Sequence, residues 1–263
     1  MKTNIIKTDQ ELYIERRRRE NIFIKMARIA VLLLFIGIWE LASDLSIIDS
    51  FFFSSPSRIC LLFIDMCKNF EIFIHTGITL YETILSFLIV NILSILVSVI
   101  MLSFERFSKI VEPYLVILNS LPKSALAPLI IVWLGTGSKT IIVAGISVAL
   151  FGSIINLYTG FLQVDDEKRK LITTLGGTKK DQLTKVIIPA SIPIILSNMK
   201  VNIGLSLVGV IIGEFLAARQ GLGYLIIYSS QVFQLDMLIM SIIILCLIAL
   251  LLYQSIDWLE KNV

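Results

Sequence analysis

The chain has 263 residues, of which 56% are apolar and only 16% are charged, with a formal net charge of +3 and a mean hydropathy of +0.88. Soluble domains carry about 45–50% apolar and about 25% charged residues, so this composition excludes an ordinary soluble domain, and it is also the opposite of a disordered chain. Three cysteines without paired spacing and a single histidine give no basis for a disulfide framework, a metal site or a bound cofactor.

Residues 1–28 form a basic segment with eight lysines and arginines, four of them consecutive at positions 16–19. A run of arginines can bind nucleic acid, but positive residues also collect on the cytoplasmic side of membrane proteins. The apolar stretch that follows favours this second interpretation, so no nucleic-acid partner is expected. A cleaved signal peptide is not expected either, because so long and charged a segment precedes the stretch.

Six membrane-spanning helices are predicted, three of them from uncharged runs. A helix needs about 20 apolar residues to cross the hydrocarbon core of a bilayer. Only helices and closed barrels can span lipid, and these runs lack the strict alternation of barrel strands. The uncharged runs are 84–104, 140–164 and 237–256.

The other three predicted spans are apolar stretches that charges or prolines interrupt. The first contains Glu40 and Asp44, and the third contains Lys123. Pro122 and Pro128 are both expected to break the third span, because proline removes a backbone hydrogen bond. These spans are 29–48, 113–135 and 186–213.

Between the first two spans, residues 55–74 are predicted to form an amphipathic helix on the membrane surface or on the helix bundle. Its apolar side chains recur at helical steps, and its charged side chains would occupy the wetter side. The apolar positions are Ile59, Leu62, Phe63, Met66 and Phe70. His75, just beyond, is interpreted as an ordinary polar residue at the start of the second span.

Lysine and arginine are distributed unevenly between the two sides that six spans create. Seventeen lie on the side that holds both termini, and four lie on the other side. Because cytoplasmic loops are enriched in these residues, both termini are predicted to be cytoplasmic in a multi-pass protein of the plasma (inner) membrane.

The segment 163–187 is polar and lies between the fourth and fifth spans, on the predicted cytoplasmic side. Asp165 is placed to cap a short helix, with Asp166 and Glu167 in its first turn. Carboxylates are favourable there, because the helix dipole is positive at its N-terminus.

A second short helix is predicted to follow after a glycine bend. Gly176 and Gly177 would end the first helix, and Thr178 with Asp181 fits a capping box for the second, which enters the membrane near Pro189. Two capped helices on a tight bend form a rigid element that can transmit a displacement.

This segment resembles the EAA loop of the permease subunits of ATP-binding-cassette (ABC) importers, in which an E-A-A triplet precedes a glycine and a hydrophobic stretch ending in proline. Gly176 stands at the glycine and residues 186–189 at the hydrophobic end, while Lys-Leu-Ile at 170–172 replaces the triplet. Other stretches are similar to permeases of the nitrate/sulfonate/taurine type. They are 53–57, 75–79, 111–114, 119–122, 127–135, 212–217 and 221–226.

The resemblance implies the fold of a type I ABC importer permease, an all-α membrane protein of about six transmembrane helices. It also implies a homodimer or a pair of permeases, a cytoplasmic dimer of ABC ATPases that receives the coupling helices, and an external solute-binding protein. The coupling residues would be Asp165, Asp166, Glu167, Leu171, Leu175, Gly176, Gly177, Thr178, Asp181 and Pro189. The predicted cytoplasmic segments contain no phosphate-binding loop, so ATP hydrolysis is assigned to the partner and no enzymatic activity to this chain.

The resemblance further implies a pathway for a small polar or anionic solute, such as taurine, another sulfonate, nitrate or a thiamine-precursor pyrimidine. The alternative is a secondary transporter or channel that needs no ATPase. That class often shows half-to-half repeats with paired broken helices, and no clear duplication is visible in this sequence.

Two of the predicted spans carry small and polar residues at helical spacing. Such faces let helices approach closely and hydrogen-bond to each other, so packing is the favoured interpretation and a pathway wall at a dimer centre is the alternative. The residues are Gly145, Ala149, Gly152, Asn156 and Gly160 in the fourth span, and Asn198, Asn202, Ser206, Gly209 and Gly213 in the fifth.

For two charged residues of this region, the sequence leaves more than one interpretation open. By helix rise, Lys200 lies about 16 Å beyond Pro189, near mid-membrane, where a charge faces protein or water. A salt bridge to an internal acid such as Glu82 or Glu214, or snorkelling, is slightly favoured over contact with an anionic solute. Glu214 begins an external loop, where it is expected to be solvated, to cap the loop or to act in a gate, and residues 221–223 are expected to form a turn before a short external helix.

The expected domain organisation is therefore a cytoplasmic segment 1–28, one transmembrane permease domain 29–260 with its coupling loop at 163–187, and a tail at 261–263.

Overall fold

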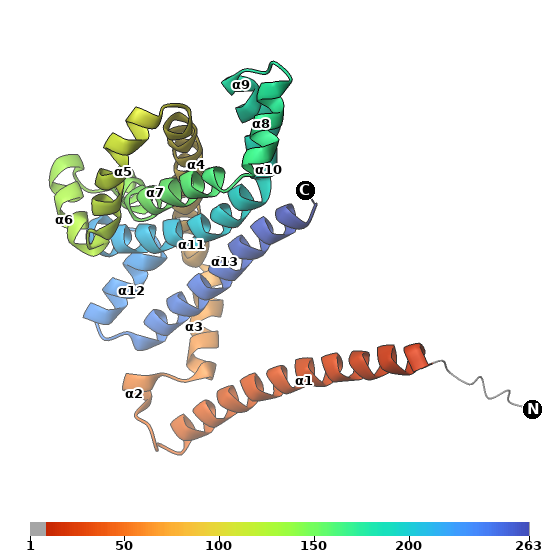
Figure 1. Cartoon of the computed structure of the whole chain (residues 1–263). Coiled ribbons are helices and arrows are strands. Elements are labelled where there is room, and N and C mark those ends of the chain that lie inside the picture. Colours follow the sequence, from red (N-terminus) through yellow and green to blue (C-terminus); the bar gives the residue numbers. More distant parts are fainter. Residues whose placement is uncertain (1–8, 263) are drawn as a thin grey trace, which may run out of the picture. The chain divides into compact units, whose positions relative to one another are not determined.

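The structure, a computed structural model, describes residues 9–262 and is helical over this range apart from short connections (Figure 1). The helices are α1 (Asp9–Asp44), α2 (Ser50–Phe53), α3 (Pro56–Lys68), α4 (Glu71–Ser103), α5 (Glu105–Ser120), α6 (Lys123–Leu134), α7 (Ser138–Leu162), α8 (Asp166–Thr174), α9 (Lys179–Gln182), a π-helical turn (Leu183–Ile187), α10 (Ile188–Ala190), α11 (Ile192–Ala217), α12 (Leu222–Gln231) and α13 (Leu235–Asn262). The prediction of an all-α protein is confirmed, since these elements include no strand.

The chain forms two compact units, Met1–Leu62 and Phe63–Val263, and the boundary falls within α3. In the first unit, α1 runs without a break from the basic segment into the apolar one, so no helix ends at the predicted boundary after residue 28. Apolar side chains such as Leu32 and Phe35 are exposed around α1. A helix that is apolar on every side needs lipid or a partner around it.

Glu40, one of the two charges in the first predicted span, has a partner within this unit. Its Oε2 accepts a hydrogen bond of 3.0 Å from the backbone N–H of Ser57, at the start of α3. The carboxylate therefore satisfies one of the N–H groups that the first turn of a helix leaves free.

The amphipathic helix α3 is shorter than predicted. Ile59 and Met66 are buried, but Phe63 is 42% exposed and Phe70 lies beyond the helix and is 68% exposed. Phe70 has a φ of 60° and separates α3 from α4. The segment 55–74 is thus two helices joined at a sharp turn, and Phe70 does not belong to the buried face.

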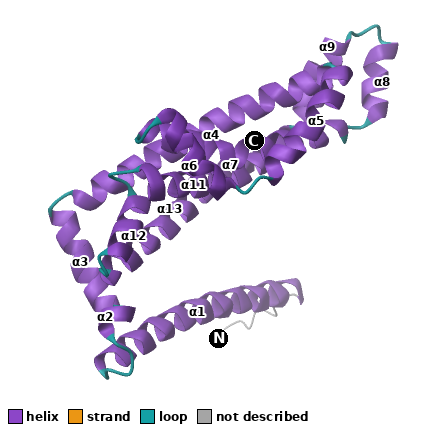
Figure 2. Cartoon of the chain, turned by 90° about the vertical axis from the view of Figure 1, so that its left-hand side faces the viewer, coloured by secondary structure: helices purple, strands orange, loops and turns teal. Residues whose placement is uncertain are grey.

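The second unit is built around α4, α7 and α11, which lie side by side (Figure 1). Helices α5 and α6 pack against α7, and α12 packs against α11 and α13. Figure 2 shows α8 and α9 projecting from one end of this unit and α12 lying towards the other end.

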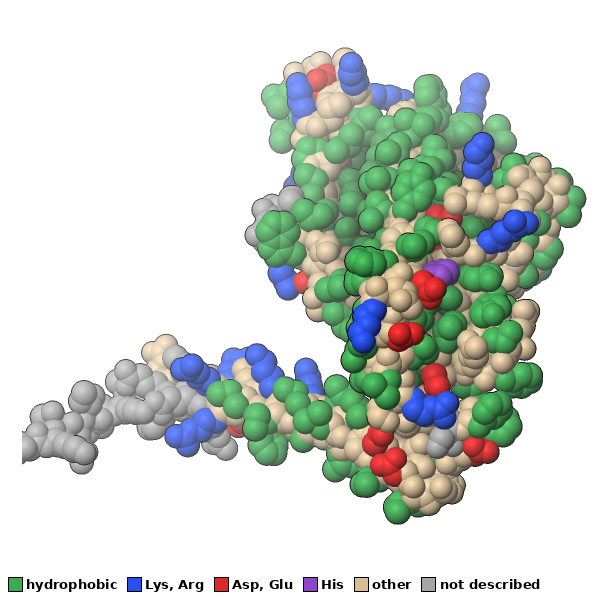
Figure 3. All heavy atoms as spheres, turned by 180° about the vertical axis from the view of Figure 1, so that it is seen from behind, with side chains coloured by type: hydrophobic (Ala, Val, Ile, Leu, Met, Phe, Trp, Pro, Cys, Tyr) green, Lys and Arg blue, Asp and Glu red, His purple; other side chains and the backbone are tan. Residues whose placement is uncertain are grey.

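Five helices are long and apolar enough to span a membrane: α1, α4, α7, α11 and α13. The bent pair of α5 and α6 is a sixth candidate, with 98° between its two helices. This agrees with the predicted number of spans. Apolar side chains also cover much of the face in Figure 3, as lipid contact requires.

The third predicted span differs in two respects from the structure. Its helix α5 begins at Glu105, eight residues before the predicted start of the span at residue 113. The break lies at Leu121 and Pro122, both in extended conformation, whereas Pro128 lies inside α6 and does not break it. The residue before a proline disfavours the helical conformation, and this places the bend at Leu121.

Candidate functional site

The projecting segment that begins at Asp165 is held by capping interactions, as predicted. The Asp165 carboxylate accepts a hydrogen bond of 2.8 Å from the N–H of Glu167 and caps α8. At the other end, the N–H of Gly177 donates to the Ile172 carbonyl at 2.8 Å and that of Gly176 donates to the Thr173 carbonyl at 3.0 Å. These two bonds form a Schellman motif, in which Gly176 takes a φ of +79°.

The capping box of α9 is present. The Thr178 hydroxyl accepts from the N–H of Asp181 at 3.3 Å, and the Asp181 carboxylate accepts from the N–H of Thr178 at 2.9 Å. Lys185 lies 2.8 Å from the other carboxylate oxygen. The hydrogen bond from Lys185, together with those from Thr178, holds the pKa of Asp181 well below its usual range.

Two further contacts make α8 and α9 one rigid element. The side-chain amide of Gln182 donates to the Thr173 hydroxyl at 2.7 Å and so ties α9 to α8. At the base, Ile187 is buried against Leu157 and Phe161 of α7. The chain then continues through α10, where Pro189 occupies the first turn, into α11, so the helical path from the projecting segment to the membrane is almost unbroken.

The outer surface of this element, which corresponds to the predicted coupling loop (residues 163–187), carries two exposed apolar side chains. Leu171 is 58% exposed and Leu175 is 75% exposed. Asp166 and Glu167 are also exposed. Two exposed apolar side chains that charged residues surround, on a rigid segment that projects from the helix bundle, are suited to docking into a groove of another protein.

A cavity of about 500 Å³ lies at the base of the coupling loop. Arg169, Lys179 and Lys180 line it on the loop side, and Glu105 and Ser108 of α5 line it on the other. This end of the second unit is therefore basic, and its cytoplasmic orientation stays a prediction.

The polar face of the fifth predicted span is buried between helices. The side-chain amides of Asn198 and Asn202 each donate to Ser153 on α7, at 2.7 and 2.9 Å, and Asn202 also donates to Asn91 on α4 at 2.9 Å. Ser206 is fully buried. Asn156 is different, because it is exposed and lines a shallow cavity of about 370 Å³ beside Asn198.

The glycines of the same two helices allow close contact. A Cβ atom on Gly209 would lie 2.8 Å from the Gly145 Cα, and one on Gly213 would lie 3.0 Å from the Ile141 Cα. Helix packing, the favoured interpretation, thus accounts for these positions. A role of this face in a solute pathway stays a prediction.

Lys200 pairs with acids that the sequence analysis did not consider. Its Nζ lies 2.5 Å from a carboxylate oxygen of Asp257 and also contacts Glu260, both near the end of α13. The suggested partners Glu82 and Glu214 were therefore wrong, although the interpretation as an internal salt bridge was right. The pairing places Lys200 beside the last turns of α13, not opposite the middle of that helix.

Glu214 is not solvated; it is 1% exposed. Its carboxylate accepts from the Thr79 hydroxyl at 2.7 Å and from the N–H of Gly223 at 2.5 Å. Thr79 in turn accepts from the N–H of Leu222 at 2.8 Å, and His75 Nδ1 accepts from the N–H of Gly221 at 2.9 Å.

Side chains from α4 and α11 thus bind three successive N–H groups at the start of α12. A Cβ atom on Gly221 would lie 2.5 Å from the Glu214 carboxylate, so glycine is required there. The predicted short helix is present, but it begins at Leu222, so only Gly221 of the predicted turn 221–223 lies in the bend before it. His75, interpreted as an ordinary polar residue, is instead part of this anchor and stacks on Tyr224.

The comparisons with known proteins agree with this architecture. Residues 90–263 match the family described as the inner membrane component of binding-protein-dependent transport systems, which covers more than half of the chain. The chain belongs to this family. It is therefore an inner-membrane permease component of an ABC importer, with several membrane spans, as the resemblance implied.

Relatives and solved structures support the assignment to these inner-membrane components. An ABC transporter permease protein of Haemophilus influenzae is 31% identical over 84% of this chain and 90% of that protein. An aliphatic sulfonates transport permease protein, SsuC, of Bacillus subtilis is 27% identical over 86% of this chain and 82% of that protein. A chain of the methionine ABC transporter MetNI, solved in an inward-facing conformation, shares the fold with a TM-score of 0.63 at 17% identity, over 71% of this chain and 93% of that chain.

Sequence reasoning missed several residues of this permease component that the fold brings together. Thr79 follows His75 at a helical spacing of four residues, which places both on one face of α4, and this signal was available. The pairing of Asn91 and Ser153 with the asparagines of α11 was not predictable, because it depends on which helices become neighbours.

Proposed function

We propose that two permease subunits, either two copies of this chain or this chain and a related one, enclose the solute pathway of the importer. Both termini and the coupling loop face the cytoplasm, where the loop docks onto a dimer of ABC ATPases. A separate solute-binding protein delivers the solute on the outer side. ATP binding and hydrolysis take place on the ATPases, and this chain converts their movement into opening of the pathway.

The observation that carries this proposal is the rigid, doubly capped coupling loop with its exposed Leu171 and Leu175. A rigid body transmits a displacement at its tip to its base, and the base here packs on α7 and continues into α11. Both helices belong to the three-helix core. Movement of an ATPase that holds the loop would therefore reorient the core helices.

The solute proposed for this pathway is small and polar or anionic. The similarity to a permease named for aliphatic sulfonates supports this class. The exposed polar side chain of Asn156, beside Asn198, is suited to line a pathway for such a solute. Lys200 is not proposed to bind it, because Asp257 and Glu260 already neutralise its charge.

A transport assay tests the proposal. Proteoliposomes would contain this chain alone, or this chain with its partner ABC ATPase and solute-binding protein. Uptake of labelled ethanesulfonate and taurine would be measured with and without ATP. We expect uptake only with the complete set and ATP. Uptake by the chain alone, without nucleotide, would instead show a secondary transporter or channel and would refute the proposal.

A further inference from the structure

The cavity of about 500 Å³ at the base of the coupling loop, which we call the basal cavity, lies where candidate membrane spans end. Its wall includes Ser103, the last residue of α4, Glu105, the first of α5, and Leu162, the last of α7. The uncharged runs 84–104 and 140–164 end here as well. Each run is about as long as the hydrocarbon core is thick, so the basal cavity lies at the depth of the lipid headgroups.

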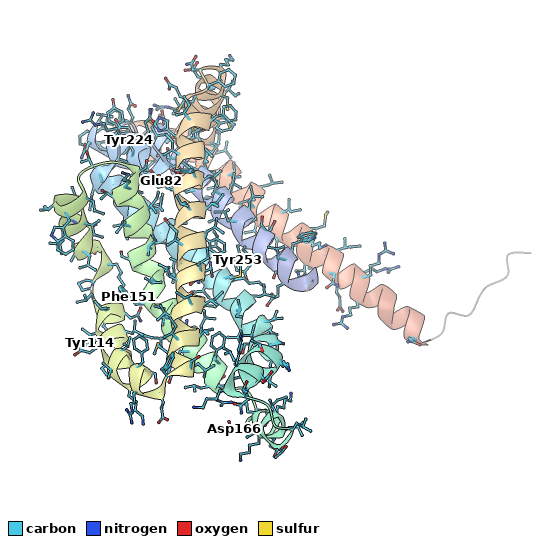
Figure 4. The ribbon with its side chains drawn as sticks, turned by 90° about the horizontal axis from the view of Figure 1, so that it is seen from above. Glu82, Tyr114, Phe151, Asp166, Tyr224 and Tyr253 are labelled. Atoms are coloured by element: carbon cyan, nitrogen blue, oxygen red, sulfur yellow. The ribbon has the colours of Figure 1, made fainter. Side chains whose placement is uncertain are left out.

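Apolar side chains of the membrane helices and of the loop base line one part of the basal cavity. They are Met101, Leu102, Leu162, Leu183 and Ile187. Figure 4 shows this end of the second unit, marked by Asp166 of α8, far from Glu82 and Tyr224. Leu162 is 47% exposed, and an exposed leucine at headgroup depth is suited to contact the upper part of a lipid acyl chain.

The coupling loop supplies the basic part of the wall, which consists of Arg169, Lys179 and Lys180. Arg169 already pairs with an acid of its own helix at 3.0 Å. Lys179 and Lys180 are exposed, and neither forms a salt bridge with a residue in the described part of the chain. The acidic residue of the wall, Glu105, lies 2.7 Å from Lys109, and Lys179 interacts with it electrostatically without forming a salt bridge. Two lysines therefore remain available for an anion.

A ligand of the basal cavity has to match both parts of the wall. Lysine binds phosphate oxygens through charge-assisted hydrogen bonds, and the positive wall disfavours a headgroup that carries its own cation, such as choline. A free phosphate ion would leave the apolar part without a partner, whereas a phospholipid brings acyl chains to the same depth. Basic pockets between membrane helices are suited to lipid headgroups for these reasons. The volume is also within the range of small-molecule sites, about 300–1,000 Å³.

We infer that the basal cavity binds an anionic phospholipid such as phosphatidylglycerol, with its phosphate at Lys179 and Lys180 and its acyl chains along Leu162. The glycerol hydroxyls of the headgroup can donate to Glu105, which accepts but cannot donate when it is ionised. The bound lipid thus contacts the coupling loop on one side and the start of α5 on the other. The inference goes beyond the proposed function and does not depend on which side of the membrane the loop faces, because the basal cavity lies at a membrane surface in either orientation.

The test uses the full-length chain in detergent micelles and native mass spectrometry, which counts the lipids that stay bound. Phosphatidylglycerol and phosphatidylcholine with identical acyl chains are titrated separately. We expect the first bound phosphatidylglycerol to have a dissociation constant at least about tenfold lower than that of the first phosphatidylcholine. Glycerol phosphate, which is the headgroup without acyl chains, is added as a competitor and should not displace the lipid at an equal concentration.

Two double variants show where the lipid binds. Lys179→Gln with Lys180→Gln should abolish the preference for phosphatidylglycerol, because the phosphate then meets no free cation in the wall. Lys168→Gln with Lys170→Gln is the matched control, since it removes the same charge from exposed positions of the same loop that do not line the basal cavity. The control should retain the preference. All four lysines are exposed, so both variants should fold, which circular dichroism can verify.

Three results would overturn the inference. Equal binding of the two lipids would show that the basal cavity does not select an anionic headgroup. An equal loss of preference in both double variants would show a diffuse attraction to the basic loop, without a defined site. Displacement of the lipid by glycerol phosphate at an equal concentration would show a site for a free phosphate compound. None of these measurements involves the ATPase or a transported solute, so their outcome is separate from that of the transport assay.

Discussion

Gly176 shows how one residue sets the shape of the coupling loop. Its φ of +79° lies in the left-handed region, and beyond its two chain neighbours no atom of the described residues lies within 4 Å of the position of a Cβ. A substitution there would clash with nothing in this chain. Its cost is backbone strain, about 1–2 kcal/mol for a residue other than glycine and highest for a β-branched one.

We therefore predict that Gly176→Val lowers ATPase stimulation in the assembled importer while the chain still inserts into the membrane. The valine shifts the bend and displaces Leu175 from its docking position. Gly176→Asn should retain most of the stimulation, because asparagine tolerates the left-handed conformation. Gly204→Val, at a helical glycine with equally open space, is the matched control. Normal stimulation in Gly176→Val would contradict the role of the coupling loop.

Asp181 provides a prediction on pH. Because its pKa is lowered in the folded loop, chiefly by Lys185, its stabilising contribution is present above the pKa of an unfolded aspartate and is lost only as the pH falls through the lower folded value. We expect hydrogen-exchange protection of residues 178–185, corrected for intrinsic rates, to stay constant between about pH 5 and 8.

The variant Asp181→Ala should reduce that protection at every pH in this window, because it removes both the capping box and the ion pair with Lys185. Asp166→Asn, which alters only the ion pair with Arg169 in α8, serves as the control and should leave residues 178–185 unchanged. Unaltered protection in Asp181→Ala would show that the capping box does not hold α9.

At the scale of helices, Lys200 joins α11 to the end of α13. Its side chain is 15% exposed, and those of Asp257 and Glu260 are 28% and 32% exposed. Removing this cation leaves Asp257 with only the exposed Lys261 as a partner and leaves Glu260 beside it without the lysine. Losing one partner of a buried ion pair costs more than losing the whole pair.

We accordingly predict that Lys200→Met lowers the thermal stability of the chain in nanodiscs, measured by the midpoint of unfolding. The triple variant Lys200→Met, Asp257→Asn, Glu260→Gln should recover most of the loss, because the one charge that loses its partner, Lys261, is 73% exposed and stays solvated. A triple variant as unstable as the single one would indicate that the lysine acts through packing alone.

The helices also show which features the sequence could predict. Span number and the caps of α8 and α9 were predictable, because apolar run length and capping patterns are local properties. The position of the bend in the third span was harder, since Pro122 and Pro128 look alike in sequence. Only at Pro122 does the preceding residue, Leu121, take an extended conformation, while α6 accommodates Pro128.

Non-local contacts were not predictable from the sequence. Lys200 meets Asp257 only because α11 and α13 pack together, 57 residues apart in the chain. Glu214 is buried because α4 and α12 close over it, so a residue that looks like a loop carboxylate becomes an anchor.

At the scale of the whole molecule, the family assignment identifies the chain as an importer permease. The next property to establish is which side of the membrane the coupling loop faces. Basic residues gather at the loop end of the second unit, and α12 lies towards the opposite end (Figure 2). The proposed function requires the coupling loop to face the cytoplasm, because only there can the loop contact an ATPase that uses cellular ATP.

Cysteine labelling at residue 175 measures this sidedness directly. Leu175→Cys would be made in a chain whose three free cysteines, Cys60, Cys67 and Cys246, are replaced by serine, and exposed to a membrane-impermeant thiol reagent. We predict no labelling in intact cells, labelling in inverted vesicles stripped of the ATPase, and protection when the ATPase is added back. Labelling of residue 175 from the outside of intact cells would contradict this prediction.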